Sequence, residues 1–175
     1  MHRLIPCPFF IILLVILFQS NICQAVTNED KISFLKQGWA FQIGNTSQDV
    51  IKNIGNPIKI NRIKNKNSST ELTELVYDGL IVKITEKSGD RHLGLAYVNI
   101  KNSKYKIKNG LAIGSDENQI YNYFGQEILK RARKENNQII IGLETITGDE
   151  TDSIQDIFVI FTIKNKKILG VEWNI

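Results

Sequence analysis

Apolar and polar residues alternate through most of the chain beyond residue 57, and this period of two predicts β-strands. Tight-turn sequences such as Asp78-Gly79 and Asn136-Asn137 interrupt the alternation. We therefore expect consecutive strands to pair as antiparallel hairpins. The predicted strands are Ile58–Ile63, Leu72–Tyr77, Leu80–Thr85, Leu93–Ile100, Ile128–Lys134, Gln138–Thr145, Ile157–Ile163 and Ile168–Asn174.

Apolar residues spaced three and four positions apart precede the first strand and predict helices. The segment Glu29–Trp39 has this spacing and predicts a short amphipathic helix. In the segment Ile43–Pro57, a second helix is expected to begin after Thr46, whose hydroxyl can accept a backbone N–H. Asp49 is favourable near the positive end of that helix. Gly55 is expected to end it in the left-handed conformation.

The segment Ile43–Pro57 has a second copy at Ile113–Glu127, with glycines and apolar positions in register. In this copy Asp116 is the predicted N-cap, and Gln119 is placed to complete a capping box. Gly125 is expected to end the helix as Gly55 does. Helices this short are not stable alone, so both must pack on a sheet.

The duplication extends to the last strands, because Leu93–Tyr97 matches Leu169–Trp173. It predicts an α+β fold of two tandem helix-plus-antiparallel-sheet repeats, which form one continuous curved sheet with helices on one face. The predicted organisation is a signal peptide at 1–25, a first repeat at 26–100, a basic connection at 101–112 and a second repeat at 113–175.

Residues 1–25 have the pattern of a cleaved bacterial secretory signal. Their apolar run, Leu4–Phe18, is short for a membrane span of about 20 residues, and Ala25 ends a small-residue cleavage site. We expect a periplasmic or secreted protein without disulfides, because cleavage there leaves no cysteine. Two alternatives tether the protein to a membrane: a retained signal, or lipidation of Cys23, which the bulky Ile22 before it disfavours.

The formal net charge is +4, and two clusters of basic residues account for it. Such clusters suggest nucleic-acid binding, but export from the cytoplasm argues against that class of partner. Charged side chains also protect the edges of sheets from mispairing, which is the interpretation we favour. The clusters are Lys101, Lys104, Lys106 and Lys108, and Lys130, Arg131, Arg133 and Lys134.

The sequence predicts no enzyme, metal site or cofactor. His92 lies beside Asp90 in a predicted turn, without an identifiable serine or cysteine nucleophile to complete a catalytic group. Zinc lacks enough ligands, and neither Gly44 nor Gly114 has the lysine and second glycine of a phosphate loop. An exposed acidic loop explains the remaining carboxylates better than calcium binding does. These carboxylates are Asp149, Glu150, Asp152 and Asp156.

The candidate partner-binding residues are two arginines and two glutamates on predicted strands. Arg131 and Arg133 share one strand face and are the residue type that anchors protein interfaces. We expect them on the open sheet surface near Glu144 and Glu172, where they would contact another protein.

The duplicated segment resembles the signature of a superfamily of exported bacterial modules. Residues Gly44, Thr46, Val50, Gly55 and Pro57 match its Gly-x-Thr-x-x-x-Val-x-x-x-x-Gly-x-Pro pattern. The superfamily includes the small lipoprotein of the outer-membrane barrel-assembly machinery and the secreted β-lactamase inhibitor protein. The doubling is more similar to the inhibitor, whose two units form one curved sheet with a concave binding face.

This chain departs from the inhibitor in having no mature cysteine, and from the assembly lipoprotein in its poor lipidation site. No binding residue carries over, because the matching positions build caps and core. The resemblance implies an exported, non-enzymatic module for inhibition, immunity or envelope assembly, whose partner is another exported or envelope protein. The alternatives are a membrane-tethered structural or accessory envelope protein, and a small-ligand or cell-wall binder that uses the open sheet face.

Overall fold

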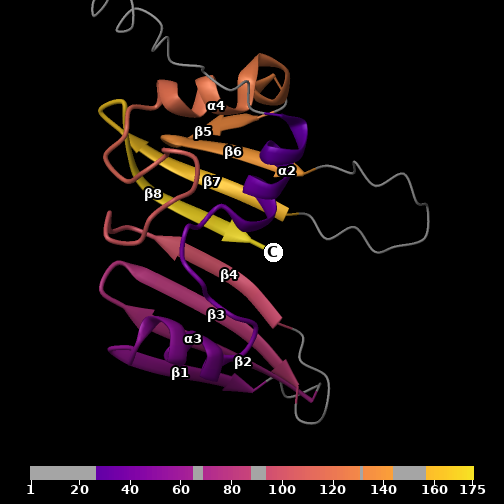
Figure 1. The fold of residues 1–175 in the computed structure, drawn as a ribbon, viewed down its shortest axis with the longest axis vertical. Coiled ribbons are helices and arrows are strands. Elements are labelled where there is room, and N and C mark those ends of the chain that lie inside the picture. Colours follow the sequence, from indigo (N-terminus) through magenta and orange to yellow (C-terminus); the bar gives the residue numbers. More distant parts are fainter. Residues whose placement is uncertain (1–26, 65–68, 88–93, 131, 144–156) are drawn as a thin grey trace, which may run out of the picture.

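A computed structural model describes residues 27–64, 69–87, 94–130, 132–143 and 157–175, which form three helices and eight strands (Figure 1). The predicted signal peptide, His92, Arg131, Glu144 and the acidic loop lie outside these residues. The helices are α2 (Asn28–Gln37), α3 (Ser47–Ile54) and α4 (Asn118–Leu129). The strands are β1 (Lys59–Lys64), β2 (Thr70–Tyr77), β3 (Leu80–Lys87), β4 (Gly94–Ile100), β5 (Arg133–Glu135), β6 (Gln138–Leu143), β7 (Ile157–Lys164) and β8 (Lys167–Asn174).

All eight strands belong to one antiparallel sheet in the order β1-β2-β3-β4-β8-β7-β6-β5. We call β1–β4 the early strands and β5–β8 the late strands. The two sets join where β4 pairs with β8 in the middle of the sheet. At this junction Val98 lies opposite Trp173, and Ile100 lies opposite Val171. All four side chains are fully buried, so the junction is held by core packing as well as by the backbone ladder.

The predicted fold class, two tandem helix-plus-sheet repeats, is wrong: the described residues form mostly one eight-stranded antiparallel sheet with few helices. Helix α2 shows why, because it does not pack with the strands that follow it in the chain. Its Phe34 ring lies 6.4 Å from the Phe161 ring of β7 and 6.1 Å from the Trp173 ring of β8. The similar sequences mark where α3 and α4 form, but they do not mark separate packing units.

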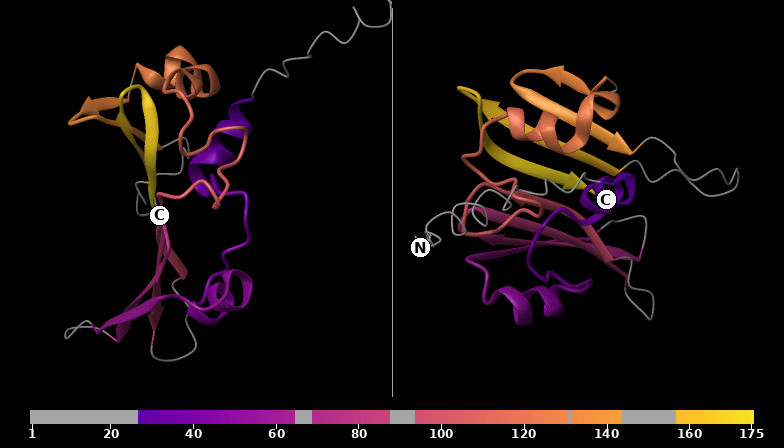
Figure 2. Two further views of the ribbon diagram at one scale, coloured as in Figure 1. Left: turned by 90° about the vertical axis from the view of Figure 1, so that its left-hand side faces the viewer. Right: turned by 45° about the horizontal axis from the view of Figure 1, so that its top comes forward.

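The hydrophobic core lies on the face of the sheet that α2 and α3 cover (Figure 2). Residues from all three helices enter it, including Phe34 of α2, Val50 of α3 and Phe124 of α4. Within the core Trp39 packs edge to face on Trp173, with the ring centres 5.7 Å apart. Gly38 permits this contact, because a Cβ at that position would overlap the Trp173 ring.

Helix α3 begins as predicted, whereas α4 begins differently. Thr46 caps α3, with Asp49 N–H donating to Thr46 Oγ1 at 3.1 Å and Thr46 N–H donating to Asp49 Oδ2 at 3.2 Å. In α4 the N-cap is Glu117, one residue later than predicted, and it has no side-chain cap. Asp116 Oδ1 still accepts from the Asn118 N–H at 3.0 Å, but Gln119 does not complete the predicted capping box. Asp116, the residue before this N-cap, forms a β-bridge with Lys167.

The two helix-ending glycines adopt the predicted positive φ, but their ψ angles are extended rather than left-handed helical. Gly55 has φ 102° and ψ −174°, and Gly125 has φ 76° and ψ 167°. After Gly125 the chain makes another helical segment, which ends by burying Leu129 in the core. The predicted strand Ile128–Lys134 is therefore wrong over its first half, and β5 is short.

The chain between β4 and α4 runs beside the segment that follows α2. Ala40 N–H donates to the Lys106 carbonyl at 2.8 Å, and Lys108 N–H donates to the Gly38 carbonyl at 2.7 Å. Trp39 and Ile107 form the β-bridge between these hydrogen bonds, and both side chains are buried. No helix within the described ranges is long and apolar enough to cross a membrane.

Candidate functional site

The face of the sheet opposite the core is the candidate functional site, and we call it the helix-free face. Its side chains alternate along each strand with the core side chains, and directly opposed residues on antiparallel strands share a face. One row of opposed residues crosses the whole sheet from β1 to β5, and we call it the central row. In strand order it comprises Lys59, Val76, Ile81, Asn99, Glu172, Ile160, Ile140 and Arg133.

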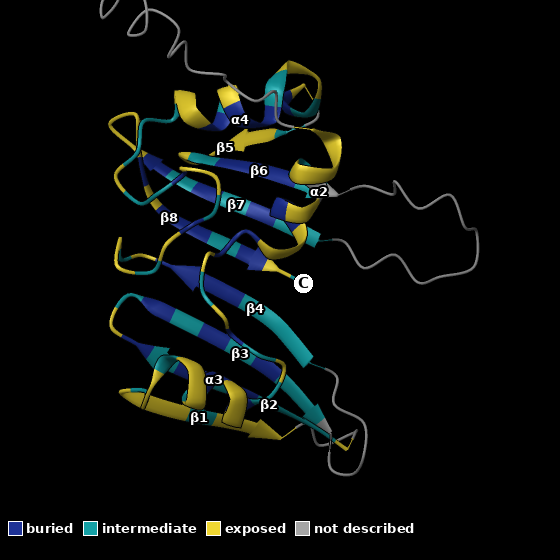
Figure 3. Cartoon of the chain, in the orientation of Figure 1, coloured by how far each residue is buried: buried dark blue, intermediate teal, exposed yellow. Residues whose placement is uncertain are grey.

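The central row has the same order of chemistry on both sides of the β4–β8 junction. A cation lies at each end, two apolar residues follow it inward, and a polar or acidic residue occupies the middle. Most of the face is partly buried, while Asn99 and Ile140 are only 5% and 8% exposed (Figure 3). The row therefore presents an apolar surface with a polar centre and basic ends.

A hydrogen-bond network fixes the polar centre of the helix-free face. Tyr97 of β4 is its hub: the hydroxyl accepts from Asn99 Nδ2 at 2.8 Å and donates to Glu172 Oε2 at 2.9 Å. Because a carboxylate only accepts, the tyrosine proton must point to Glu172, which fixes the orientation of the asparagine amide. Asn99 Oδ1 is then buried without a hydrogen-bond partner among the described residues.

The network continues toward β1 through an ion pair. Lys83 Nζ lies 4.9 Å from the centre of the Tyr97 ring and 3.3 Å from Glu74 Oε2. The other carboxylate oxygen, Glu74 Oε1, accepts from Asn61 Nδ2 at 2.7 Å. These contacts link β1, β2, β3, β4 and β8, so the fold itself holds the polar side chains in place.

The electrostatic effects of this network appear in two pKa values. Burial is the main cause that raises the pKa of Tyr97 to about 12, with a further contribution from Glu172. The hydrogen bond from Asn61 is the main cause that lowers the pKa of Glu74, and Lys83 adds to it. Tyr97 therefore remains a neutral hydrogen-bonding group at neutral pH, and Glu74 remains an ion-paired carboxylate.

An apolar area occupies the helix-free face over β6 and β7. Ile160 and Ile140 lie opposite each other in the central row, and Phe158 lies opposite Gly142 beside them. The Phe158 ring covers the glycine so closely that a Cβ there would come within 3.1 Å of it. Apolar surface next to fixed polar groups is the composition of a protein-binding surface.

The structure brings together only part of the predicted partner-binding site. Arg133 and Glu172 lie in the same central row, but β6 and β7 separate their strands, which puts about 14 Å between them. Glu172 binds Tyr97, and Arg133 forms no ion pair within the described ranges. Arg131 and Glu144 lie outside the described residues.

The sequence prediction missed Tyr97, Asn99, Lys83 and Glu74. The sequence feature that could have indicated this network is Asn99, a polar residue between Val98 and Ile100 on an apolar strand. Its hydrogen-bonding partners depend on strand register, which the sequence did not provide. Over the part of the chain that the structure describes, no group of three histidine, cysteine, aspartate or glutamate residues is placed to hold a metal ion.

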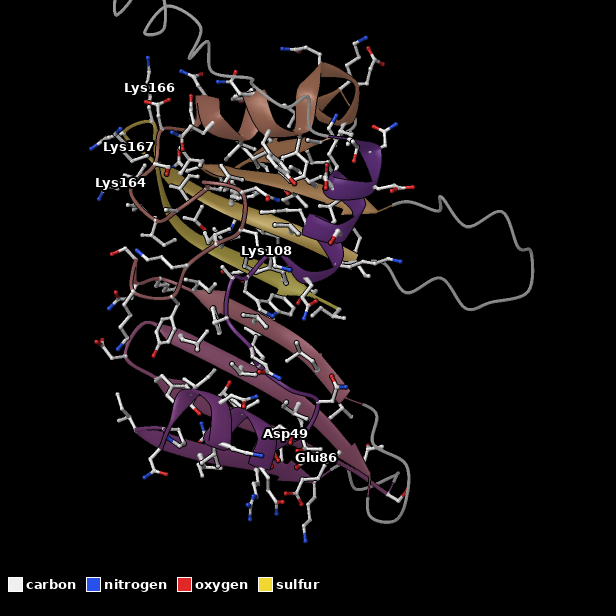
Figure 4. The ribbon with its side chains drawn as sticks, viewed as in Figure 1. Asp49, Glu86, Lys108, Lys164, Lys166 and Lys167 are labelled. Carbon is white, nitrogen blue, oxygen red and sulfur yellow. The ribbon has the colours of Figure 1, made fainter. Side chains whose placement is uncertain are left out.

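Charged residues also gather at two places outside the helix-free face (Figure 4). Lys164, Lys166 and Lys167 surround the β7–β8 turn, and Lys167 Nζ lies 3.8 Å from Asp116 Oδ2. Glu86 sits at the start of α3, where its carboxylate accepts from the Ser47 N–H at 3.0 Å. The lysines point to solvent, whereas Glu86 anchors α3 to the sheet.

No family model and no curated protein matches this chain. Among solved structures, the chain is similar to an extracellular protein containing a SCP domain from Bacillus anthracis str. Ames. The sequence identity is 12% and the TM-score is 0.39, over 75% of this chain and 43% of that chain. This chain thus spans less than half of the other protein's length, and a TM-score this low assigns neither a family nor a function.

Proposed function

We propose that this protein is an exported, non-enzymatic module that binds another exported or envelope protein through the helix-free face of its sheet. The observation that carries the proposal is the central row, in which a fixed polar centre is flanked by apolar residues and ends in cations. The fitting partner has apolar side chains over Ile160 and Ile140, a hydrogen-bond donor toward Glu172, and acidic groups toward Lys59 and Arg133.

Two features of the sequence support export and a protein partner. Residues 1–25 have the pattern of a secretory signal, which leads to a periplasmic or secreted location in a bacterium. The Ile43–Pro57 signature resembles that of exported modules that bind other proteins. Preformed hydrogen bonds at the polar centre also reduce the ordering cost of binding.

Site-specific photo-crosslinking in the exporting host tests which face is used. A photoreactive residue replaces Val76 or Ile160 on the helix-free face, and Lys52 on the exposed side of α3 serves as the control. We expect Val76 and Ile160 to crosslink to the same protein and Lys52 to crosslink to none. Crosslinks from Lys52 alone would overturn the proposal.

A binding measurement with that purified partner then tests the apolar part of the face. Ile160→Asp should weaken binding by about tenfold or more, because it buries a charge against the partner's apolar side chains. Gln48→Asp, at an exposed position of α3, makes the same one-unit charge change and should leave the affinity unchanged. Loss of binding in both variants would indicate a general charge effect and contradict the proposed surface.

A membrane-tethered accessory protein is the second candidate, and it depends on the apolar run Leu4–Phe18 and on Cys23. Cell fractionation and mass spectrometry of the mature N-terminus separate the two candidates. A chain that starts at Val26 in the soluble periplasm would exclude the tether. A retained signal or a lipid on Cys23 would support it.

A further inference from the structure

Strand β1 is a free edge of the sheet. Among the described residues it pairs only with β2, in the register from Lys59 opposite Val76 to Lys64 opposite Glu71. In an antiparallel strand about half of the backbone N–H and C=O groups point away from the neighbouring strand. These groups on β1 face outward and form a template on which another strand can pair.

The side chains of β1 are unusually exposed for a strand of this sheet (Figure 3). Only Asn61 is partly buried, while Ile60 is 43% exposed and Ile63 is 59% exposed. Ile58, directly before the strand, is 75% exposed. Leu169 is the other large apolar residue with such exposure in the described ranges, so exposed apolar surface concentrates on this edge.

The same strand carries only positive charges. Its Lys59, Arg62 and Lys64 are exposed, and no acidic residue lies on it. Arg62 Nε approaches Glu71 Oε1 of β2 at 3.6 Å. Lys59 and Lys64 form no ion pair within the described part of the chain, so both remain open to an external anion.

We propose that the β1 edge binds an extended segment of a partner protein that carries acidic and apolar residues on both of its faces, and that this segment adds to the sheet as a further strand. Successive side chains of β1 point to opposite faces, so Lys59 and Ile63 share one face and Ile60 and Lys64 share the other. The outward backbone groups supply the hydrogen bonds, and on each face of the added strand an apolar residue contacts an isoleucine and an acidic residue pairs with a lysine. Strand addition recognises extended peptides in this way.

The charges of β1 select this occupant over a second copy of the same chain. Full antiparallel overlap of β1 with a second β1 would place Lys59 opposite Lys64 at both ends of the pair, and like charges destabilise cross-strand pairs. Lysine on an edge strand also deters unwanted pairing. That protective role does not account for three exposed isoleucines on the same edge, whereas an acidic and apolar partner strand accounts for both features.

The β1 edge adjoins the helix-free face of the proposed function, and Lys59 belongs to both. A strand added beyond β1 extends the sheet sideways and leaves the polar centre at Tyr97 and Glu172 uncovered. Either surface can therefore fail its test while the other passes.

A peptide-binding experiment with the protein purified from its exporting host tests the edge. The probe is a fluorescent peptide of about ten residues, a length that spans a typical strand. It contains the sequence Glu-Val-Glu-Thr-Val-Glu, which in the antiparallel register places a glutamate opposite each basic residue of β1 and a valine opposite each isoleucine. The matched probe has lysine in place of every glutamate. We expect the glutamate peptide to bind in fluorescence anisotropy and to slow amide exchange in β1, and the lysine peptide not to bind.

Charge-reversed variants sharpen the test. The double variant Lys59→Glu/Lys64→Glu should bind the glutamate peptide about tenfold more weakly and gain affinity for the lysine peptide. The control variant Lys164→Glu/Lys166→Glu makes the same charge change at the β7–β8 turn and should bind like the wild type. Absence of binding, equal losses in both variants, or slowed exchange on other strands instead of β1 would each overturn the proposal.

Discussion

At the scale of single residues, the Tyr97 hydroxyl is the most connected group of the helix-free face. Tyr97→Phe removes the acceptor of Asn99 and the donor to Glu172 at once. We expect the free energy of unfolding to fall by about 1–3 kcal/mol, because partly buried polar groups lose their partners. Urea unfolding measures the change. Tyr121→Phe is the control and should change little, because among the described residues its hydroxyl accepts a hydrogen bond from the exposed Lys134 alone.

The raised pKa of Tyr97 gives this residue a pH-dependent effect. Its pKa is about 12 in the folded protein against 10.0 for an ordinary tyrosine, so the folded state holds the proton more tightly. The resulting stability is fully present below about pH 10 and is lost as pH rises toward about 12. The stability difference between wild type and Tyr97→Phe should therefore narrow as the pH rises from about 10 toward about 12. A difference that widens over this range would contradict the assignment.

Lys166 occupies a backbone conformation that favours glycine. In the β7–β8 turn it has φ 59°, which costs a residue with a Cβ about 1–2 kcal/mol. After allowing for the greater freedom of glycine in the unfolded chain, Lys166→Gly should raise the free energy of unfolding by about 0.5–1 kcal/mol. Thermal unfolding measures it. Lys164→Gly, within strand β7, should instead lower stability.

At the scale of elements, the two similar helix starts differ in how they are capped. Thr46→Ala should destabilise the protein by about 1 kcal/mol, because the hydroxyl of Thr46 satisfies the Asp49 N–H at the start of α3. Gln119→Ala should have almost no effect, since Gln119 completes no capping box in α4. Denaturant unfolding of both variants measures this. Equal losses would mean that Gln119 has a role that the cap geometry does not explain.

The sequence predicted elements well wherever the determining interactions are local. The cap at Thr46 and the chain ranges of most strands depend on residues a few positions apart, and they were predicted closely. Contacts between distant segments were not predicted. Sequence similarity suggested two repeats, yet α2 packs on β7 and β8, because burial of Phe34 against Phe161 and Trp173 decides its position.

The candidate site shows the same division. Exposed charge at Arg133 was predicted from its own strand pattern. The network around Tyr97 was not, because it requires the register in which Tyr97 lies opposite Lys83 and Asn99 lies opposite Glu172. A shift by one residue would send each of these side chains to the core face.

At the scale of the whole molecule, the pairing of β4 with β8 makes one sheet of the early and late strands. Val171 is the test position, because it is fully buried, lies opposite Ile100 across the junction and opposite Phe161 within the late strands. Val171→Ala should lower the free energy of unfolding by about 2 kcal/mol through lost burial and a small cavity. Amide hydrogen exchange measures which strands lose stability in this variant.

If the sheet unfolds as one unit, the slowest amides of β2–β3 and of β6–β7 should accelerate by the same factor in Val171→Ala, about thirtyfold for 2 kcal/mol. Val159→Ala, buried within the late strands, should have the same uniform effect. If β2–β3 keep their wild-type rates in both variants, the early strands unfold independently of the late ones. A partner that spans the central row would then also have to hold the two parts together, and its binding would slow exchange on both sides of the β4–β8 junction.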